Sequence, residues 1–178
     1  MSASPAVRAL MVGAFCLVVL GGMLVRHAWP LWTGETIYLK VRPVDPRDLF
    51  RGDYVILGYD VSTMAAEPER RTVPGETQYV QLEPVPSTVP GVSQEYVGVS
   101  LASEPVEGVV NLAGIVQSAN SETVRLDFGI DALFVQEGTG RPIEDAIRRD
   151  VPVYAEIAVT PRGSARVRAL IIEGHRVP

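Results

Sequence analysis

The chain has 178 residues and a formal net charge of −5, and its acidic excess lies beyond an N-terminal apolar segment flanked by Arg8 and Arg26. This balance argues against nucleic acid as a partner, because nucleic-acid binding requires a basic surface. The only cysteine, Cys16, falls inside the apolar segment, so the rest of the chain has no disulfide of its own and no thiolate metal site.

The first predicted element is a membrane-spanning helix. The run Ala9–Val25 has no charge and no proline, and as a helix it would extend about 26 Å, close to the thickness of a bilayer's hydrocarbon core. Trp29 and Trp32 follow it, as is typical of the headgroup region. A cleaved signal peptide is the alternative, but no small-x-small site follows the run. We therefore predict an uncleaved, single-pass anchor in the cell membrane over residues 1–34, in contact with the lipid bilayer.

The orientation of the anchor is not decided by charge alone. Arg8 and the N-terminal amine on one side are balanced by Arg26, Lys40 and Arg42 on the other. Since a signal-anchor near the start of a chain usually keeps its short tail inside, we predict the domain on the extracytoplasmic side. The alternative is a cytoplasmic domain tethered to the inner face of the membrane.

Residues 35–178 are predicted to form one β-rich domain, large enough for a hydrophobic core, because Pro and Gly punctuate short runs of Val, Ile, Leu and Tyr. In Thr36–Val41, apolar residues alternate with others, so Ile37, Leu39 and Val41 share a face that can be buried. Further strands are predicted at Tyr54–Val61, Tyr79–Val85, Tyr96–Leu101, Val109–Gln117, Thr123–Phe128, Val151–Val159 and Val167–Ile172. Ser118–Ser121 and Thr160–Ser164 have turn chemistry and would close two hairpins, and Val151–Val159 would bury one face.

Three segments between these strands are expected to differ from them. Ser62–Gln78 is polar and indicates a long exposed loop or a short helix flanked by coil, and Pro84–Gln94 indicates a proline-rich loop. Pro142–Arg149 is predicted as a short helix, with Pro first, acidic residues in the first turn and arginines in the last. The predicted fold class is therefore mainly β: a single N-terminal transmembrane helix followed by one β-rich domain, sheet or barrel-like, with a short helix.

The segment Asp45–Tyr54 packs turn-forming and charged residues between two apolar strands. Asp45-Pro46 is suited to start a turn, and Gly52 supplies a backbone conformation that side chains resist. In the strand that follows, residues pointing to both faces are apolar or aromatic, which predicts a central strand.

Gly52–Tyr59 reads G-D-Y-V-I-L-G-Y and matches the G-D-Y-x-x-L-x-Y signature, so the chain resembles the GDYXXLXY family of bacterial membrane-anchored proteins. Val44–Arg51, Phe128–Ile130, Phe134-Val135 and Glu137–Arg141 are similar to that family too, whereas Ala132-Leu133 stands where its members more often carry a charge and an aromatic. The family has no established biochemical activity. The resemblance implies a membrane setting and an association with multi-spanning membrane proteins. We interpret the motif residues as structural or partner-binding: Asp45, Pro46, Arg47, Asp48, Arg51, Gly52, Asp53, Tyr54, Leu57 and Tyr59.

The sequence does not predict an enzyme. A nucleophile needs a nearby base, yet His27 is at the membrane face, His175 is in the C-terminal tail and Lys40 is the only lysine. Arg51–Val55 faintly resembles a strand of membrane-bound signal peptidases, but their catalytic residues have no counterpart here, so this is a fold-level analogy. Glu137–Arg141 is glycine-rich without the lysine of a phosphate-binding loop, and a tight strand-to-helix connection explains it better.

No metal or other cofactor is expected either. Asp45, Asp48 and Asp53 do not follow the spacing of a calcium loop. Arg42, Arg47 and Arg51 are interleaved with them, so local ion pairs are the favoured interpretation.

Two functional hypotheses remain. The first is a non-catalytic accessory or interaction protein that docks on a multi-spanning membrane protein. The second is a ligand-binding or sensing module at the membrane surface, with Asp45–Tyr59 as a pocket wall. A signal-peptidase-like β fold without its catalytic residues ranks below both. The distinguishing observation is whether Arg47, Asp48, Arg51, Asp53, Tyr59 and Glu137 converge on a cleft or only hold turns together.

Overall fold

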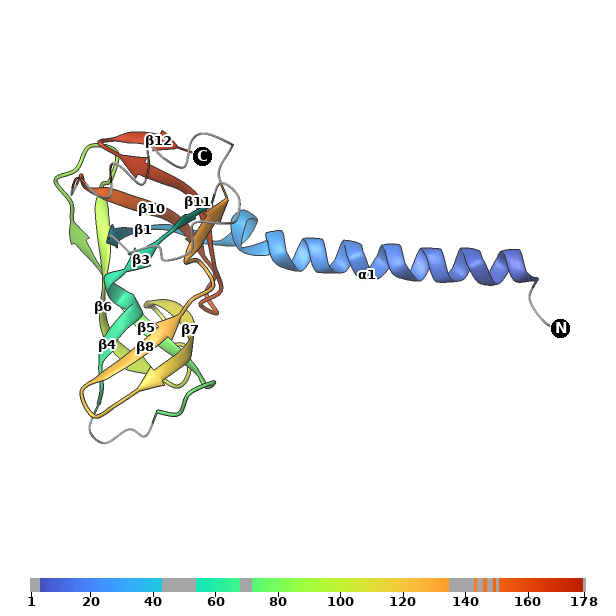
Figure 1. The fold of residues 1–178 in the computed structure, drawn as a ribbon, viewed down its shortest axis with the longest axis horizontal. Coiled ribbons are helices and arrows are strands. Elements are labelled where there is room, and N and C mark those ends of the chain that lie inside the picture. Colours follow the sequence, from blue (N-terminus) through green and yellow to red (C-terminus); the bar gives the residue numbers. More distant parts are fainter. Residues whose placement is uncertain are drawn as a thin grey trace.

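A computed structural model describes residues 4–42, 54–67, 72–134, 143, 146, 149 and 151–177 of the chain. A single long helix, α1, projects from a domain of antiparallel strands (Figure 1). In that view the strands next to the helix form one part of the domain, and β4 to β8 form the part farther from it. The prediction of a mainly β fold with one N-terminal helix is therefore confirmed.

Helix α1 runs from Pro5 to Thr33, beyond the predicted apolar run at both ends. Its N-cap is Ser4, whose Oγ accepts a hydrogen bond from Val7 N at 3.4 Å. The 25 residues Ala9–Thr33 are long and apolar enough to cross a membrane, and the most apolar window of this segment has no residue buried by the rest of the protein. A signal sequence near an N-terminus meets the same conditions. Trp29 and Trp32 lie within the helix and are 53% and 69% exposed.

Three antiparallel sheets make up the described domain. One five-stranded sheet has the order β12-β11-β10-β1-β3, a second has the order β4-β8-β7-β5-β6, and β2 pairs with β9 alone. Contacts between β1 and β6 bring the two larger sheets together, so that the whole nearly closes. The strands are β1 (Glu35–Arg42), β2 (Tyr54–Ile56), β3 (Gly58–Tyr59), β4 (Thr63–Ala65), β5 (Thr77–Pro86), β6 (Gln94–Ala102), β7 (Val110–Ala119), β8 (Thr123–Asp127), β9 (Ala132–Phe134), β10 (Val153–Val159), β11 (Ala165–Ile172) and β12 (His175–Val177).

The main core lies between the two five-stranded sheets. In β1 the predicted alternation holds, and Ile37, Leu39 and Val41 are buried. They meet side chains from the second sheet in one continuous cluster. Each fully buried aliphatic side chain contributes about 1.5–3 kcal/mol through its removal from water. The largest fully buried side chains are Ile37, Leu39, Leu57, Leu82, Leu112, Ile130, Ile143, Ile157 and Leu170.

Strand β10 is buried on both faces, whereas the sequence predicted one buried face. The alternate residues that were predicted to share one face also face the main core, namely Val153, Ala155, Ile157 and Val159. On the opposite face, Tyr154 packs with Val92 in a small second cluster. Glu156 on that face is covered by an arginine from β12. The second face is thus covered by segments that are distant in sequence, and strand periodicity does not reveal them.

The prediction of one central strand over Tyr54–Val61 is wrong. This segment divides into β2, β3 and a 3-10 turn, η1 (Asp60–Ser62). β2 belongs to the two-stranded sheet, and β3 is the last strand of its sheet in the described part of the chain. Between them the backbone N–H of Leu57 donates to Asp131 O at 2.7 Å. The apolar residues on both faces therefore reflect a chain that passes from one sheet to another.

Other boundaries also differ from the predictions. Ser62–Gln78 contains strand β4, which pairs with β8, instead of being only loop or helix. Pro84–Gln94 is not all loop, because β5 continues to Pro86. The prolines are tolerated because pairing of β5 with β7 ends at Leu82, so that beyond it β5 pairs only with β6. β9 and β12 were not predicted.

The short helix predicted at Pro142–Arg149 falls mostly outside the described residues. Ile143 and Ala146, which are described, are helical and buried.

Candidate functional site

The motif strand is held against a second segment that also resembles the family. Tyr54, Val55 and Ile56 of β2 pair with Phe134, Leu133 and Ala132 of β9. The next contacts are the Leu57–Asp131 backbone bond and a side-chain bond from Tyr59 to Ile130. The motif and residues 130–134 therefore form one unit, which sequence reasoning did not pair.

Tyr59, the last residue of the motif, has a buried phenol. Its side chain is 2% exposed, and its hydroxyl donates to Ile130 O at 2.8 Å. Burial, followed by the negative charge of Asp131, raises the pKa of Tyr59 far above its ordinary value. The phenol is therefore neutral and acts as a fixed hydrogen-bond donor, which suits a structural part and not that of a general base.

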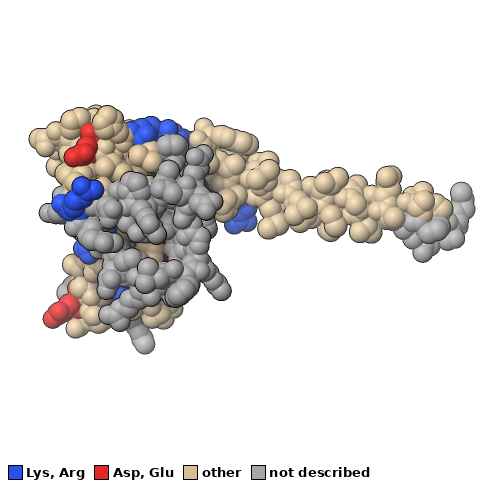
Figure 2. Space-filling view, turned by 45° about the horizontal axis from the view of Figure 1, so that its top comes forward, with Lys and Arg blue, Asp and Glu red and all other residues tan. Residues whose placement is uncertain are grey.

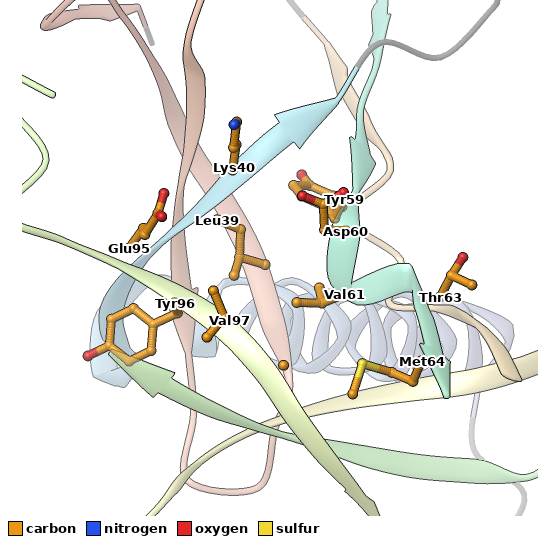
Figure 3. Close-up of a pocket in the computed structure, with 11 residues that line it drawn as sticks. Leu39, Lys40, Tyr59, Asp60, Val61, Thr63, Met64, Glu95, Tyr96 and Val97 are labelled. Carbon is orange, nitrogen blue, oxygen red and sulfur yellow. The ribbon is translucent and has the colours of Figure 1, made fainter. Parts of the chain in front are cut away.

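A cleft of about 200 Å³ lies where β1, the β3–η1–β4 segment and β6 approach each other. In Figure 3 the side chains of Leu39, Val61 and Val97 point into this space. Lys40 and Glu95 extend together toward one side of it. The cleft therefore has an apolar interior with charged groups at its edge.

Two acidic groups at the cleft, Asp60 and Glu95, are already engaged with other side chains. Asp60 Oδ1 accepts from Arg42 Nε at 2.8 Å, in an ion pair whose side chains are 66% and 48% exposed. Glu95 faces Tyr154, whose pKa is raised by burial and then by the hydrogen bond and charge of Glu95. The described residues that line the cleft include no serine, cysteine or histidine, the usual nucleophiles and base of such a site.

The predicted site is only partly within the described residues. Asp45, Pro46, Arg47, Asp48, Arg51, Gly52 and Asp53 lie outside them, as does Glu137. Tyr54 is placed by its backbone in β2, and Leu57 and Tyr59 are buried. From the sequence, the question was whether six charged or aromatic residues of this region converge on a cleft. Of these six, only Tyr59 is among the described residues, and it lies at the wall of the cleft.

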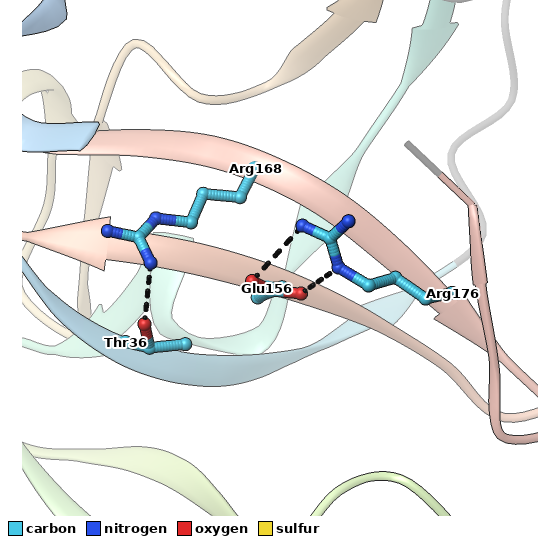
Figure 4. Close-up of polar contacts among 4 residues, drawn as sticks. All are labelled: Thr36, Glu156, Arg168 and Arg176. Atoms are coloured by element: carbon cyan, nitrogen blue, oxygen red, sulfur yellow. Dashed lines mark hydrogen bonds and ion pairs between the residues drawn. The ribbon is translucent and has the colours of Figure 1, made fainter. Parts of the chain in front are cut away.

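An ion pair between a buried glutamate and an exposed arginine was missed by sequence reasoning. Glu156 of β10 has a side chain only 12% exposed, and Arg176 of β12 reaches both of its carboxylate oxygens, at 2.7 and 3.3 Å (Figure 4). The same figure shows Arg168 of β11 donating to Thr36 Oγ1 at 2.9 Å. A lone acidic residue inside the apolar run of β10 was a signal for the first contact. No local pattern marks Arg176 as its partner.

Metal ligation finds no support in the described residues, which contain no group of three or more His, Cys, Asp and Glu side chains able to hold an ion. The arginines interleaved with Asp45, Asp48 and Asp53 remain the sequence argument for ion pairs in the segment that is not described.

These features define a class: an N-terminal apolar helix joined directly to one antiparallel β domain in which the described motif residues Leu57 and Tyr59 are buried. The chain belongs to the GDYXXLXY family, whose model, described as GDYXXLXY protein, matches residues 16–170. No curated protein and no solved structure matches the chain.

Proposed function

We propose that this protein is a single-pass membrane protein whose β domain is a non-catalytic accessory module, docked on a multi-spanning membrane protein. The observation that carries the proposal is α1, whose most apolar window is uncovered by the rest of the described chain. Its 25-residue apolar segment would be about 37 Å long, enough to cross the ~30 Å hydrocarbon core even when tilted. A helix that is apolar all round requires lipid or protein around it.

The junction of α1 with the domain supports an uncleaved anchor over a signal peptide. Arg168 Nη2 donates to Leu31 O at 2.7 Å and its Nη1 donates to Thr36 Oγ1. Gly34 alone separates the helix from β1, and a Cβ there would lie 2.9 Å from Val159 N. The helix end is thus part of the domain's packing, and removal of the whole helix would take away the Leu31 carbonyl that Arg168 uses.

The accessory part of the proposal is supported by the chemistry of the motif. The family signature ends in a tyrosine whose hydroxyl is committed to a backbone carbonyl, and Asp60 beside it is in an ion pair with Arg42. An interaction module needs a stable surface and no reactive group. We place the domain on the extracytoplasmic side of the membrane, as the sequence favours.

The anchor is tested by washing membranes with alkaline carbonate and measuring the mass of the retained chain. The full-length chain should stay in the pellet with its N-terminus intact. Val18→Arg, in the middle of α1, should weaken retention, because a charge at mid-membrane costs about 2.5–3.5 kcal/mol. The matched control is Val99→Arg on β6, where the side chain is already 46% exposed. A soluble form lacking α1 would contradict the proposal.

The side of the membrane is tested by thiol labelling. Cys16 is the only cysteine, so a Cys16→Ser background with Ser103→Cys in an exposed loop gives one reporter thiol. A membrane-impermeant maleimide should label it in intact cells. Labelling only after the cells are broken would place the domain in the cytoplasm.

Docking is tested by purification in mild detergent followed by native mass spectrometry. We expect a complex with an integral membrane protein, formed by the full chain and lost when residues 35–178 are replaced by an unrelated β domain. A chain that is always recovered alone, although it is membrane-retained, would contradict docking without affecting the anchor.

The cleft at Tyr59 favours the second candidate, a ligand-binding module. At about 200 Å³, however, it is smaller than the roughly 300–1,000 Å³ typical of small-molecule sites. This difference is why we rank docking first. A small molecule that raises the Tm of the wild type but not that of a Lys40→Ala, Glu95→Ala chain would reverse the ranking.

A further inference from the structure

A second, larger pocket lies at the angle between the end of α1 and the turn from β10 to β11. Its volume is about 960 Å³, and Arg26, His27 and Trp29 of the helix face Arg162 and Arg166 across it. In Figure 2 blue side chains border the place where the helix meets the domain, whereas the red side chains visible in that view lie away from it. The pocket is thus a basic region on a chain whose net charge is −5.

The charges in this pocket have no acidic partner in the described part of the chain. None of the described residues that line it is an aspartate or glutamate. Arg166 is held in place, because its Nη2 lies 3.1 Å from His27 Nδ1 and its Nη1 donates to Ala165 O at 2.8 Å. Its Nε is buried and has no hydrogen-bond partner.

Arg26 and Arg162 are exposed, and neither has a hydrogen bond or ion pair with any described residue. Guanidinium groups stay protonated at any physiological pH, so this charge is permanent. Two guanidinium groups without a partner among the described residues, in a described lining that contains no carboxylate, favour an anion. Phosphate is an anion that arginine binds in bidentate geometry.

The place of the pocket along the helix indicates where that phosphate comes from. The apolar side chains before it are exposed, for example Leu24 at 71%, and Trp32 just after it is 69% exposed. In a membrane-embedded α1, this transition from aliphatic residues to indoles marks the headgroup layer. Arg26 and the β10–β11 turn would then lie at the level of the lipid phosphates.

We propose that this pocket binds the phosphate of an anionic phospholipid headgroup, with Arg26, Arg162 and Arg166 as its contacts. The inference rests on the proposed membrane span. The volume exceeds that of one phosphate ion and leaves space for the glycerol part of a headgroup beside Met23 and Trp29. Arg168 is not one of these contacts, because its guanidinium already donates to the end of α1, where it fixes the angle between helix and domain.

The test uses tryptophan fluorescence, because the chain has only two tryptophans and both are in this region. The full-length chain with Trp32→Phe, in maltoside micelles, reports on Trp29 alone. It is titrated separately with short-chain phosphatidylglycerol, phosphatidylcholine and inorganic phosphate. Phosphatidylglycerol should bind at least about tenfold more tightly than phosphatidylcholine, since each basic residue contributes roughly a fivefold increase in affinity for an anionic lipid surface.

The variant pair Arg26→Gln, Arg162→Gln should weaken phosphatidylglycerol binding by about tenfold or more. The matched control removes the same charge elsewhere, with Lys40→Gln and Arg125→Gln, both exposed side chains outside the pocket. The control should bind as the wild type does.

Equal binding of the two lipids, or equal losses in both variant pairs, would overturn the inference. A response to inorganic phosphate as strong as that to phosphatidylglycerol would assign the pocket to a free anion and would contradict the binding of a lipid headgroup. Because micelle-bound chain is used, these results do not depend on carbonate retention. A chain retained in membranes but lacking headgroup selectivity refutes the lipid site alone, whereas release from membranes refutes the anchor.

Discussion

The substitution Tyr59→Phe should destabilise the domain through one hydrogen bond. It removes the hydroxyl that donates to Ile130 O at 2.8 Å and leaves the ring in place. Ile130 is 2% exposed, so water does not readily replace the lost donor. A typical hydrogen bond contributes about 1 kcal/mol net, and a buried acceptor left without a partner costs about 1–3 kcal/mol.

We therefore expect a loss of about 2 kcal/mol, which for a domain of this size lowers Tm by roughly 4–8 °C. The measurement is thermal and urea unfolding of the full-length chain in detergent, followed by circular dichroism. Tyr79→Phe is the matched control, because the Tyr79 hydroxyl has no hydrogen bond within the described chain and the side chain is only half-buried. The control should change stability by less than about 0.5 kcal/mol.

If Tyr59→Phe is as stable as Tyr79→Phe, the hydroxyl of Tyr59 does not hold the motif and residues 130–134 together. A Tyr59→Phe chain that keeps full stability yet loses its membrane partner would make Tyr59 a contact residue instead.

Three further predictions concern stability measured in the same way. Gly163→Ala should cost about 2–3 kcal/mol, because φ is +80° and the new Cβ would lie 2.7 Å from the backbone of β7. The control Gly108→Ala, at φ +77° in open space, should cost only about 1–2 kcal/mol. Equal costs would refute a close approach at Gly163. Arg176→Ala should cost about 1–2 kcal/mol of stability, because it leaves Glu156 unpaired. Adding Glu156→Gln to that variant should restore part of the lost stability. If the free-energy changes of the two substitutions simply add, the two residues are not coupled. Burial raises the pKa of Tyr59 above its unfolded value of 10.0. Its stabilisation is therefore complete below that pH and is lost as pH rises above it, by about 1.4 kcal/mol per pH unit. Relative to the wild type, Tyr59→Phe should have the shallower alkaline decline in stability, and parallel declines would contradict the pKa shift.

The sequence was most informative where a local period decides the structure. Alternation predicted β1, and turn residues predicted the hairpins around Asn120 and Gly163. In the first turn Asn120 Oδ1 accepts from the backbone N–H of Glu122 and Thr123, as turn chemistry suggests. The apolar run near the N-terminus likewise predicted α1, since a helix that long needs no tertiary partner to be recognised.

The failures share one physical cause, which is contact between segments far apart in the chain. The motif strand was expected to be central because both of its faces are apolar, but the segment is divided between two sheets, and its backbone partners lie in residues 131–134, far away in the sequence. The cover over β10 comes from β12 and from the loop before β6. Single-strand periodicity contains no information about such partners.

The candidate site divides in the same way. The signature residues Leu57 and Tyr59 can be recognised in the sequence, but their hydrogen bonds to Asp131 and Ile130 depend on tertiary structure. The charged part of the motif, from Asp45 to Asp53, lies outside the described residues, so its expected ion pairs remain a prediction.

The junction at Gly34 has a mechanical consequence. Only one residue separates α1 from β1, and Arg168 is hydrogen-bonded to the helix end, so the domain cannot rotate freely about the end of α1. When the helix rotates about its own axis, the domain therefore rotates with it. One residue inserted into the helix end would turn the domain by about 100° relative to the preceding helix. Under the proposed docking, a membrane partner bound to α1 would therefore also set the orientation of the β domain about the helix axis.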